Sequence, residues 1–178
     1  MALFTIGHST RSFDELVDLL REHGVTLLAD VRTAPGSRRM PQFTKAALAS
    51  ELPGRGIEYA HLPELGGLRR PRPDSPNAGW RNESFRGYAD HMADHDFAAG
   101  IERLLEWGRD RNVAVMCAEA VPWRCHRSLI ADALLVRGVD VTHIVGAGRT
   151  QPAMLTPFAR VEGGRITYPG PVQGQLAL

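Results

Sequence analysis

The chain has 178 residues, which suits one globular domain with a full core, and we predict a single domain over residues 1–178. The formal net charge of +1 gives no global reason to expect nucleic-acid binding, and two cysteines are too few for a disulfide-rich scaffold. No apolar run approaches the roughly 20 residues that span a membrane, and the N-terminus lacks a signal-peptide pattern. We therefore expect a cytoplasmic protein with reduced thiols and no membrane association.

The first third of the chain alternates strand patterns with helix patterns. A capping box, Ser12-Phe-Asp-Glu15, predicts the start of the first helix, and Gly24 predicts its end. Strands are expected on either side of this helix, and a later helix is expected to start with Thr44 as its N-cap. The predicted strands cover residues 3–6, 25–31 and 57–60, and the second helix ends near residue 52.

The rest of the chain continues the alternation after a long irregular stretch, residues 61–83, which contains four prolines. Such a long connection is often a lid or a binding loop, although it can also be disordered. The elements expected after it are helices at 85–95 and 97–110, a strand at 113–117, a helix at 129–136, a strand at 139–145 and a hairpin around Gly163-Gly164. This order favours a three-layer α/β/α sandwich with a mainly parallel sheet of about five strands and a small C-terminal hairpin extension.

Residues 117–127 hold both cysteines and the densest group of reactive side chains. Open α/β sheets bind ligands beyond the carboxyl ends of their strands, and polar residues follow each of the first four predicted strands. We therefore expect one cleft at that edge. The candidate catalytic residues are Cys117, Glu119, Cys125, His8 and Asp30, the candidate anion-binding residues are Arg32, Arg124, Arg127 and Ser9, and His61 and His126 are expected in the same cleft.

The positive charge of the chain is almost entirely arginine. Of 21 basic residues only Lys45 is a lysine. A guanidinium binds phosphate or carboxylate through two parallel hydrogen bonds, but a GC-rich genome also enriches arginine together with alanine, glycine and proline. Position favours the first interpretation, because the two loops that leave the expected cleft carry seven arginines: Arg32, Arg38, Arg39, Arg69, Arg70, Arg72 and Arg81.

Several chemistries fit residues 117–127. A cysteine near a helix N-terminus and flanking cations suits nucleophilic catalysis, but six residues separate Cys117 from Arg124, one more than a Cys-x5-Arg phosphate loop has. Zinc ligation by Cys117, Cys125 and His126, with His8 or His61 as a fourth ligand, lacks the usual close ligand pairs, so we assign no metal ligands although zinc stays an alternative, and no organic cofactor is indicated. Oxyanion binding by the arginines needs the fewest assumptions, while general acid–base catalysis, a redox disulfide and purely structural roles stay open.

Six motifs resemble those of the domain of unknown function 488 family, a group of small bacterial and archaeal proteins. They are Thr5-Ile-Gly-His-Ser-Thr-Arg11, Asp30-Val-Arg32 with Pro35 and Ser37, His61-Leu-Pro-Glu-Leu-Gly-Gly67, Phe85-Arg-Gly-Tyr88, Cys117-Ala-Glu119 with Pro122-Trp-Arg-Cys-His-Arg127, and His143-Ile144. The resemblance implies a three-layer α/β domain with these motifs around one cleft. It implies no particular reaction. The chain departs from the family pattern at Gln151, where we expect a histidine before a Thr-x-x-Ala stretch.

These observations favour a small enzyme that acts on a phosphate-bearing substrate, either a nucleotide or nucleic acid, in a cleft at the strand ends. One alternative is a non-catalytic nucleotide- or nucleic-acid-binding module, with stacking on Trp80 or Trp123. Another is a metal-binding or thiol redox protein. A closed pocket with Cys117 and Glu119 at its floor favours the enzyme over the binding module.

Overall fold

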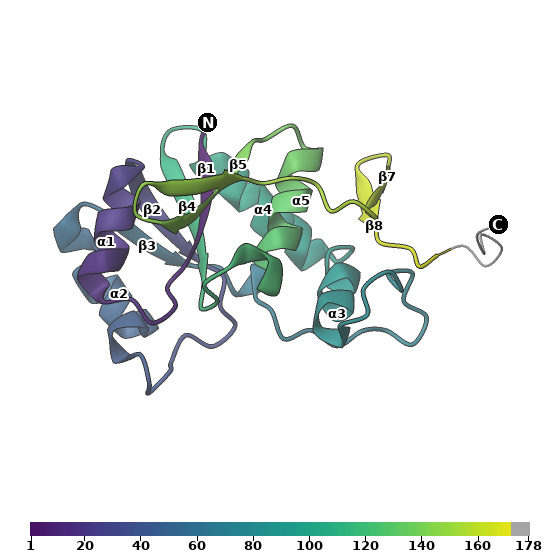
Figure 1. The fold of residues 1–178 in the computed structure, drawn as a ribbon, viewed down its shortest axis with the longest axis horizontal. Helices are drawn as coiled ribbons and strands as arrows, with labels where there is room; N and C mark the ends of the chain where they lie inside the picture. Colours follow the sequence, from purple (N-terminus) through teal and green to yellow (C-terminus); the bar gives the residue numbers. More distant parts are fainter. Residues whose placement is uncertain (172–178) are drawn as a thin grey trace.

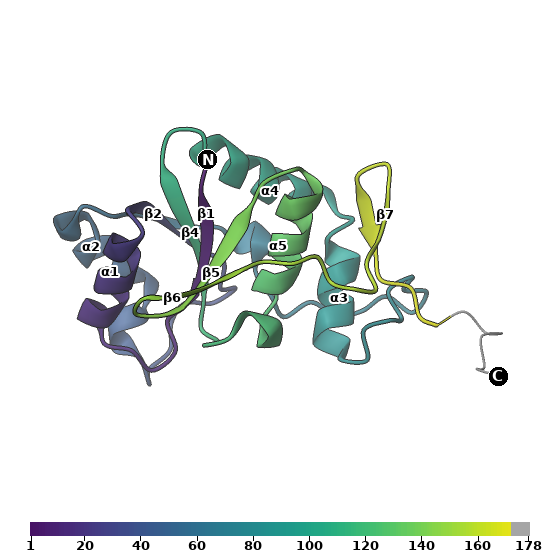
Figure 2. The same cartoon turned by 45° about the horizontal axis from the view of Figure 1, so that its top comes forward.

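The computed structural model describes residues 1–171, which form a six-stranded sheet with helices on both faces (Figures 1 and 2). The strand order is β3-β2-β4-β1-β5-β6, in which β6 pairs antiparallel to β5 and the other strands are parallel. The strands are β1 (Leu3–Gly7), β2 (Val25–Asp30), β3 (Glu58–His61), β4 (Asn112–Cys117), β5 (Val141–Gly146) and β6 (Arg149–Pro152). A separate antiparallel hairpin follows, formed by β7 (Arg160–Glu162) and β8 (Arg165–Thr167).

The helices cover the sheet in two layers. Helices α1 and α2 pack on one face, and α4 and α5 pack on the other with α3 beside them (Figure 1). The α-helices are α1 (Phe13–Glu22), α2 (Lys45–Glu51), α3 (Glu83–His91), α4 (His95–Trp107) and α5 (Arg127–Val136). Short 3₁₀ turns connect them, namely η1 (Pro41–Phe43), η2 (Pro53–Arg55), η3 (Pro63–Leu65) and η4 (Pro122–Arg124).

The central strands are apolar on both faces, because helices cover both. Leu27 packs in the cluster under α3, α4 and α5, whereas its neighbour Leu28 packs in the cluster under α1 and α2. Val113 and Ala114 of β4 divide in the same way. Each strand therefore contributes to two cores, and its near-continuous apolar sequence follows from that.

The predicted α/β architecture is confirmed, and so is the capping box at Ser12, whose hydroxyl accepts from the Glu15 N–H. One element was not expected: the sheet has a sixth strand, β6, whose four residues are all exposed and therefore lack an apolar signal. Helix α5 begins at Arg127, and Cys125 lies just before it in an extended conformation (φ −136°, ψ 149°) at the end of η4, near the helix N-terminus as expected.

Within residues 1–171, no helix is both long enough and apolar enough to cross a lipid bilayer.

Gly7 closes β1 at the point where the segment after β4 crosses it. A Cβ atom on Gly7 would lie 1.7 Å from the main-chain oxygen of Glu119, so Gly7→Ala must displace that segment. We expect the variant to lose about 2–3 kcal/mol of unfolding free energy, measured by urea denaturation. Gly54→Ala is the matched control, because a Cβ there meets nothing within 4 Å. Equal stability of both variants would contradict this packing.

Candidate functional site

The predicted strand-end residues meet at the carboxyl edge of the sheet, since the strands that carry them are parallel. The register places Gly7 beside Cys117 and Asp30 beside His61. Beyond the last strand residues, the His8 N–H donates to the Cys117 carbonyl over 3.0 Å, which continues the pairing of β1 with β4. The edge therefore brings together side chains that are far apart in the sequence.

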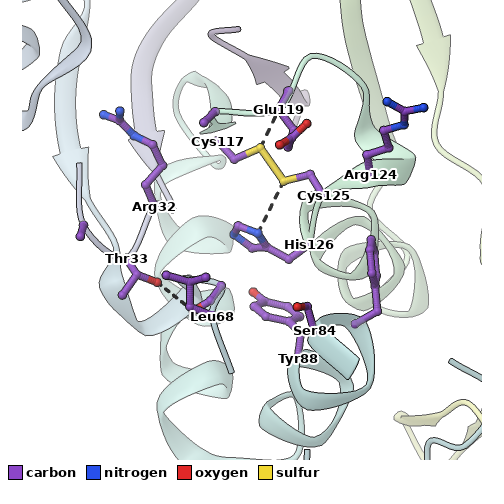
Figure 3. Close-up of a pocket in the computed structure, with 14 residues that line it drawn as sticks. Arg32, Thr33, Leu68, Ser84, Tyr88, Cys117, Glu119, Arg124, Cys125 and His126 are labelled. Atoms are coloured by element: carbon purple, nitrogen blue, oxygen red, sulfur yellow. Dashed lines mark hydrogen bonds between the residues drawn. A yellow bond between two sulfur atoms is a disulfide. The ribbon is translucent and has the colours of Figure 1, made fainter. Parts of the chain in front are cut away.

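A pocket of about 450 Å³ opens at this edge, which is large enough for a small metabolite (Figure 3). Four segments form its walls. They are the residues directly after β2, part of the long loop after η3, the first turns of α3, and the connection between β4 and α5. Both cysteines line it, and they are almost fully buried, with exposed fractions of 2% for Cys117 and 5% for Cys125. Only a molecule that enters the pocket can therefore reach them.

Arg127 is the most unusual residue of the site, because its charged side chain is fully buried. Its Nε donates to Cys117 Sγ over 3.0 Å, Nη1 donates to Thr5 Oγ1 over 3.3 Å, and Nη2 donates to the Glu119 main-chain oxygen over 2.7 Å. None of the ion pairs among the described residues includes Arg127. Burial lowers its pKa to about 10, so the guanidinium remains protonated at neutral pH.

The charge of Glu119 raises the pKa of Arg127, but no carboxylate contacts this guanidinium directly, and the group in contact that can become an anion is the Cys117 sulfur. Once reduced, Cys117 gains as a thiolate both the charge of Arg127 and its Nε–H hydrogen bond. The arrangement is therefore not that of a Cys-x5-Arg phosphate loop. The arginine that contacts Cys117 is Arg127, at the start of α5, and its guanidinium donates to protein groups rather than facing a ligand.

Hydrogen bonds through Thr5 and His143 fix the position of Arg127. Thr5 Oγ1 accepts from Arg127, so its own hydrogen is free to donate to His143 Nδ1, 2.6 Å away. The pKa of His143 falls to about 4, mainly through burial and secondarily through the charge of Arg127. His143 is therefore neutral and can accept, which fixes the orientation of the threonine and of the guanidinium.

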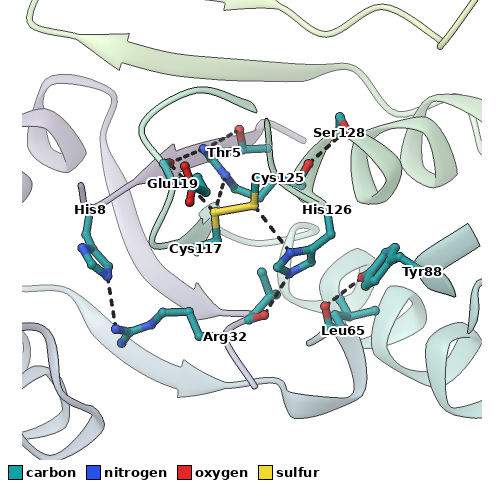
Figure 4. The surroundings of a disulfide bond; sticks show 12 residues. Thr5, His8, Arg32, Leu65, Tyr88, Cys117, Glu119, Cys125, His126 and Ser128 are labelled. Atoms are coloured by element: carbon teal, nitrogen blue, oxygen red, sulfur yellow. Dashed lines mark hydrogen bonds between the residues drawn. A yellow bond between two sulfur atoms is a disulfide. The ribbon is translucent and has the colours of Figure 1, made fainter. Parts of the chain in front are cut away.

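Cys125 has a different partner, His126. His126 Nε2 lies 3.0 Å from the Val31 carbonyl, and because a carbonyl only accepts, Nε2 carries the hydrogen. Nδ1 then presents a lone pair toward Cys125 Sγ, 3.5 Å away. Burial lowers the pKa of His126 to about 4, so the ring is neutral. Cys125 thus faces a hydrogen-bond acceptor (Figure 4), whereas Cys117 faces the Arg127 cation.

The two cysteine sulfurs are joined as a disulfide in this structure, so the expectation of reduced thiols was wrong for it. Their Cα atoms are 7.4 Å apart, whereas the Cα atoms of ordinary disulfides are about 4.4–6.8 Å apart. This separation exceeds the roughly 7 Å beyond which a bridge requires the backbone to move. The pairing of the two cysteines therefore depends on the position of the segment between them.

Asp30 and Arg32 form a second polar cluster at the same edge. The buried Asp30 carboxylate accepts from Arg32 Nε and Nη2 over 2.9 Å and 2.7 Å, and from the Tyr59 hydroxyl over 2.6 Å. Burial and the hydrogen bond to Asp30 raise the pKa of Tyr59. Arg32 Nη1 also lies 3.3 Å from His8 Nε2. Arg32 lines the pocket, but these partners engage most of its donors.

The other predicted site residues have different positions. Glu119 and Arg124 are exposed and line the pocket, whereas His61 Nε2 donates to the Arg32 carbonyl over 2.7 Å. Ser9 lies next to β4, with its N–H on the Ala118 carbonyl, and has a left-handed φ of 48°. Within residues 1–171, no group of three or more His, Cys, Asp or Glu side chains is arranged to hold a metal ion.

Sequence reasoning did not assign the opposite wall of the pocket, formed by Phe85, Tyr88, Gly67 and Leu68. The Tyr88 ring lies 4.9 Å from the His126 ring, and a Cβ on Gly67 would lie 3.0 Å from His126 Nδ1. Leu68 is 85% exposed and has a left-handed φ of 60°, which is rare for a non-glycine residue. Two of the resembling motifs contain Gly67, Phe85 and Tyr88, so they were the available signal, whereas Leu68 lies just outside them.

Comparison with known proteins gives a family. The sequence profile described as "Domain of unknown function DUF488" matches residues 12–134, more than half of the chain, and the protein belongs to this family. No curated protein and no solved structure matches the chain. The resemblance expected from the motifs is therefore confirmed.

The contact of Arg127 with Cys117 predicts an acid-shifted thiol. In a reduced Cys125→Ser background, we expect Arg127→Met to slow iodoacetamide alkylation of Cys117 at pH 7 about tenfold, because the thiolate loses its cation. The measurement is the alkylation rate against pH. Arg137→Met is the matched control, since Arg137 lies at the end of α5 and bonds only the Ala133 carbonyl. Equal rates for both variants would overturn the assignment.

His126 and His143 predict a loss of stability in acid. Both pKa values are about 4 in the folded protein and near 6.5 in the unfolded chain, so the unfolded chain binds more protons between these values. The resulting stabilisation is complete above pH 6.5 and declines as the pH falls toward 4, by about 3 kcal/mol at most for each histidine. Urea denaturation at several pH values should show a smaller slope for His143→Gln and an unchanged one for the exposed His95→Gln.

Proposed function

We propose that the protein is an enzyme in which the Cys117 thiolate attacks a small substrate that carries a phosphate or another oxyanion. The observation that carries this proposal is the hydrogen bond from the buried Arg127 guanidinium to Cys117 Sγ at the floor of a pocket. A buried cation beside a neutral cysteine lowers the stability of the fold, whereas beside a thiolate the two charges compensate each other. Because a stabilised thiolate is a nucleophile, this contact favours a catalytic role over a packing role.

The pocket supports a substrate of limited size with an apolar or planar body. Its volume of about 450 Å³ suits a molecule as large as a nucleotide, and Phe85, Tyr88 and Leu68 offer apolar surface for such a body. Arg124 supports the oxyanion, because it lines the pocket, is exposed, and has no ion pair among the described residues. A phosphate beside Arg124 would place the rest of the molecule over Cys117.

In the proposed reaction the substrate displaces water from the pocket and presents an electrophilic atom to Cys117. Arg127 keeps the thiolate oriented through Nε, while Thr5 and His143 prevent the guanidinium from turning away. Preorganised charge of this kind contributes most when water is excluded, as in a site whose nucleophile is 2% exposed. Glu119, at the rim, is the exposed carboxylate available to exchange protons with the substrate.

A binding module for single-stranded nucleic acid is the second candidate, favoured by one observation. Trp123 is 60% exposed and directly precedes Arg124, which offers a stacking surface beside a cation. The buried Cys117–Arg127 pair has no role in such a surface. The enzyme accounts for more of the site, and we therefore place it first.

Arg124 tests the oxyanion part of the proposal. A nucleoside monophosphate should raise the melting temperature of the reduced protein, and the matching uncharged nucleoside should not. Arg124→Glu should weaken the binding of the monophosphate at least tenfold, because a charge-assisted contact becomes a repulsive one. Arg109→Glu makes the same charge change on an exposed residue at the opposite edge of the sheet and should bind normally. Equal loss in both variants would refute an anion site at Arg124.

A further inference from the structure

We propose that Cys117 and Cys125 act as a nucleophile and its resolving thiol, so that the pocket reduces a small anionic disulfide. The inference rests on the proposed function, because it keeps Cys117 as the nucleophile and Arg124 as the contact for the anion. It goes further in naming the reaction and in giving Cys125 and His126 a role. The carrying observation is that two sulfurs meet at the floor of one pocket and have opposite surroundings.

The surroundings assign the roles. Cys117 receives a hydrogen bond from the Arg127 guanidinium, which stabilises its thiolate. Cys125 faces the unprotonated Nδ1 of His126, which can accept a hydrogen bond from a thiol but adds no positive charge. In the reduced pair Cys117 is therefore ready to attack, and Cys125 remains a thiol oriented by His126. Figure 4 shows the two sulfurs and the contact of Cys125 with His126.

The reaction has two exchanges. In the first, the Cys117 thiolate attacks one sulfur of the substrate, the substrate S–S bond breaks, and half of the molecule leaves as a thiolate. In the second, Cys125 Sγ attacks Cys117 Sγ while its proton passes to the thiolate released in the first exchange, so the mixed disulfide breaks and the second half leaves as a thiolate. His126 Nδ1 accepts a hydrogen bond from the Cys125 thiol and orients it for this attack, and the second product takes its proton from solvent. The substrate gains two electrons, and a small dithiol returns the cysteines to their reduced form.

The lack of a proton donor at Cys117 favours a disulfide over a hydroperoxide. Cleavage of an O–O bond releases an alkoxide or hydroxide, which needs a proton as it leaves, whereas a thiolate leaves readily without one. The hydrogen of His126 is on Nε2 and engaged with the Val31 carbonyl, and Arg127 stays protonated. The described contacts of Cys117 Sγ, from Arg127 and to the Glu119 carbonyl, therefore supply no acid.

The spacing of the two cysteines couples their bond to the backbone between them. Cys117 ends β4, and Cys125 follows η4 eight residues later, with a Cα separation of 7.4 Å. Opening the disulfide lets the segment between them relax, and that segment carries Trp123 and Arg124. Because Trp123 is 60% exposed and two residues from Cys125, its fluorescence should report the change.

Access and charge define the substrate. Both sulfurs are almost fully buried, so a disulfide on the surface of another protein does not reach them, while a molecule of small-metabolite size fits the cavity of about 450 Å³. Arg124 at the rim favours acidic groups on that molecule. We therefore expect the site to distinguish disulfides of equal length by charge.

Two disulfides of matched length test this: 3,3′-dithiodipropionate, which is dianionic, and cystamine, which is dicationic. The reduced full-length protein should react at least tenfold faster with the anionic compound, followed by Trp123 fluorescence and by mass spectrometry. The wild type should end as an intramolecular disulfide and release two equivalents of 3-mercaptopropionate. Cys125→Ser should stop at a mixed disulfide on Cys117, and Cys117→Ser should not react at a comparable rate.

Further variants and an oxidant distinguish this reaction from its alternatives. Arg124→Glu should reverse the preference between the two compounds, whereas Arg109→Glu should keep it. A wild type that stops at the mixed disulfide, a Cys117→Ser protein that reacts as fast as the wild type, or faster oxidation by equimolar hydrogen peroxide would overturn the inference. If one of these results is found while Arg127→Met still slows alkylation of Cys117, the disulfide reduction is refuted but the proposed nucleophilic function is not. If alkylation of Cys117 is insensitive to Arg127, the proposed function fails with it. Circular dichroism confirms that each variant is folded.

Discussion

A guanidinium buried at the end of the sheet, with no carboxylate as its partner, constrains the whole site. Arg127 lies under the pocket and donates to a sulfur, a hydroxyl and a main-chain oxygen. Removing a cation from water lowers stability by several kcal/mol unless anionic or well-oriented polar groups replace the solvent. Gly7, Thr5 and His143 provide the space and the orientation that these hydrogen bonds require. The position of the charge thus determines which cysteine can become a thiolate.

The contrast with Arg32 shows why one arginine is chemically informative and another is structural. Arg32 has the buried Asp30 carboxylate, which accepts two of its N–H groups and is itself bonded to Tyr59. That charge is neutralised locally, so the cluster holds the end of β2 in place beside the pocket. Arg127 has no hydrogen-bonded carboxylate; the charge of Glu119 raises its pKa without contacting it, and its Nε–H is directed at Cys117. Two arginines at the same edge therefore differ in role because of one partner.

The same distinction divides the two cysteines. Both are buried, and they are eight residues apart, yet one faces a permanent cation and the other a neutral imidazole. Burial keeps His126 neutral, and the Val31 carbonyl selects the tautomer that leaves Nδ1 free. A nucleophile and a resolving thiol need this difference, because two equal thiolates would repel each other and two equal thiols would react slowly.

Much of the fold could be predicted from the sequence. Apolar strands alternating with amphipathic helices indicate a parallel sheet covered on both faces, and that placed the polar residues after β1, β2, β3 and β4 at one edge. The exposed edge strand β6 was missed because its residues face solvent, and propensity carries little information about such a strand.

The order of the elements and the segment that holds the reactive residues follow from local periodicity and from strand ends, so both could be predicted from the amino-acid sequence. Folding brings Arg127 rather than Arg124 to Cys117, joins Thr5 to His143 across 138 residues, and makes α3 the opposite wall of the pocket. The reason is physical. Burial and pairing of a charge depend on groups brought together by folding, and their distance in space is not encoded in any local pattern.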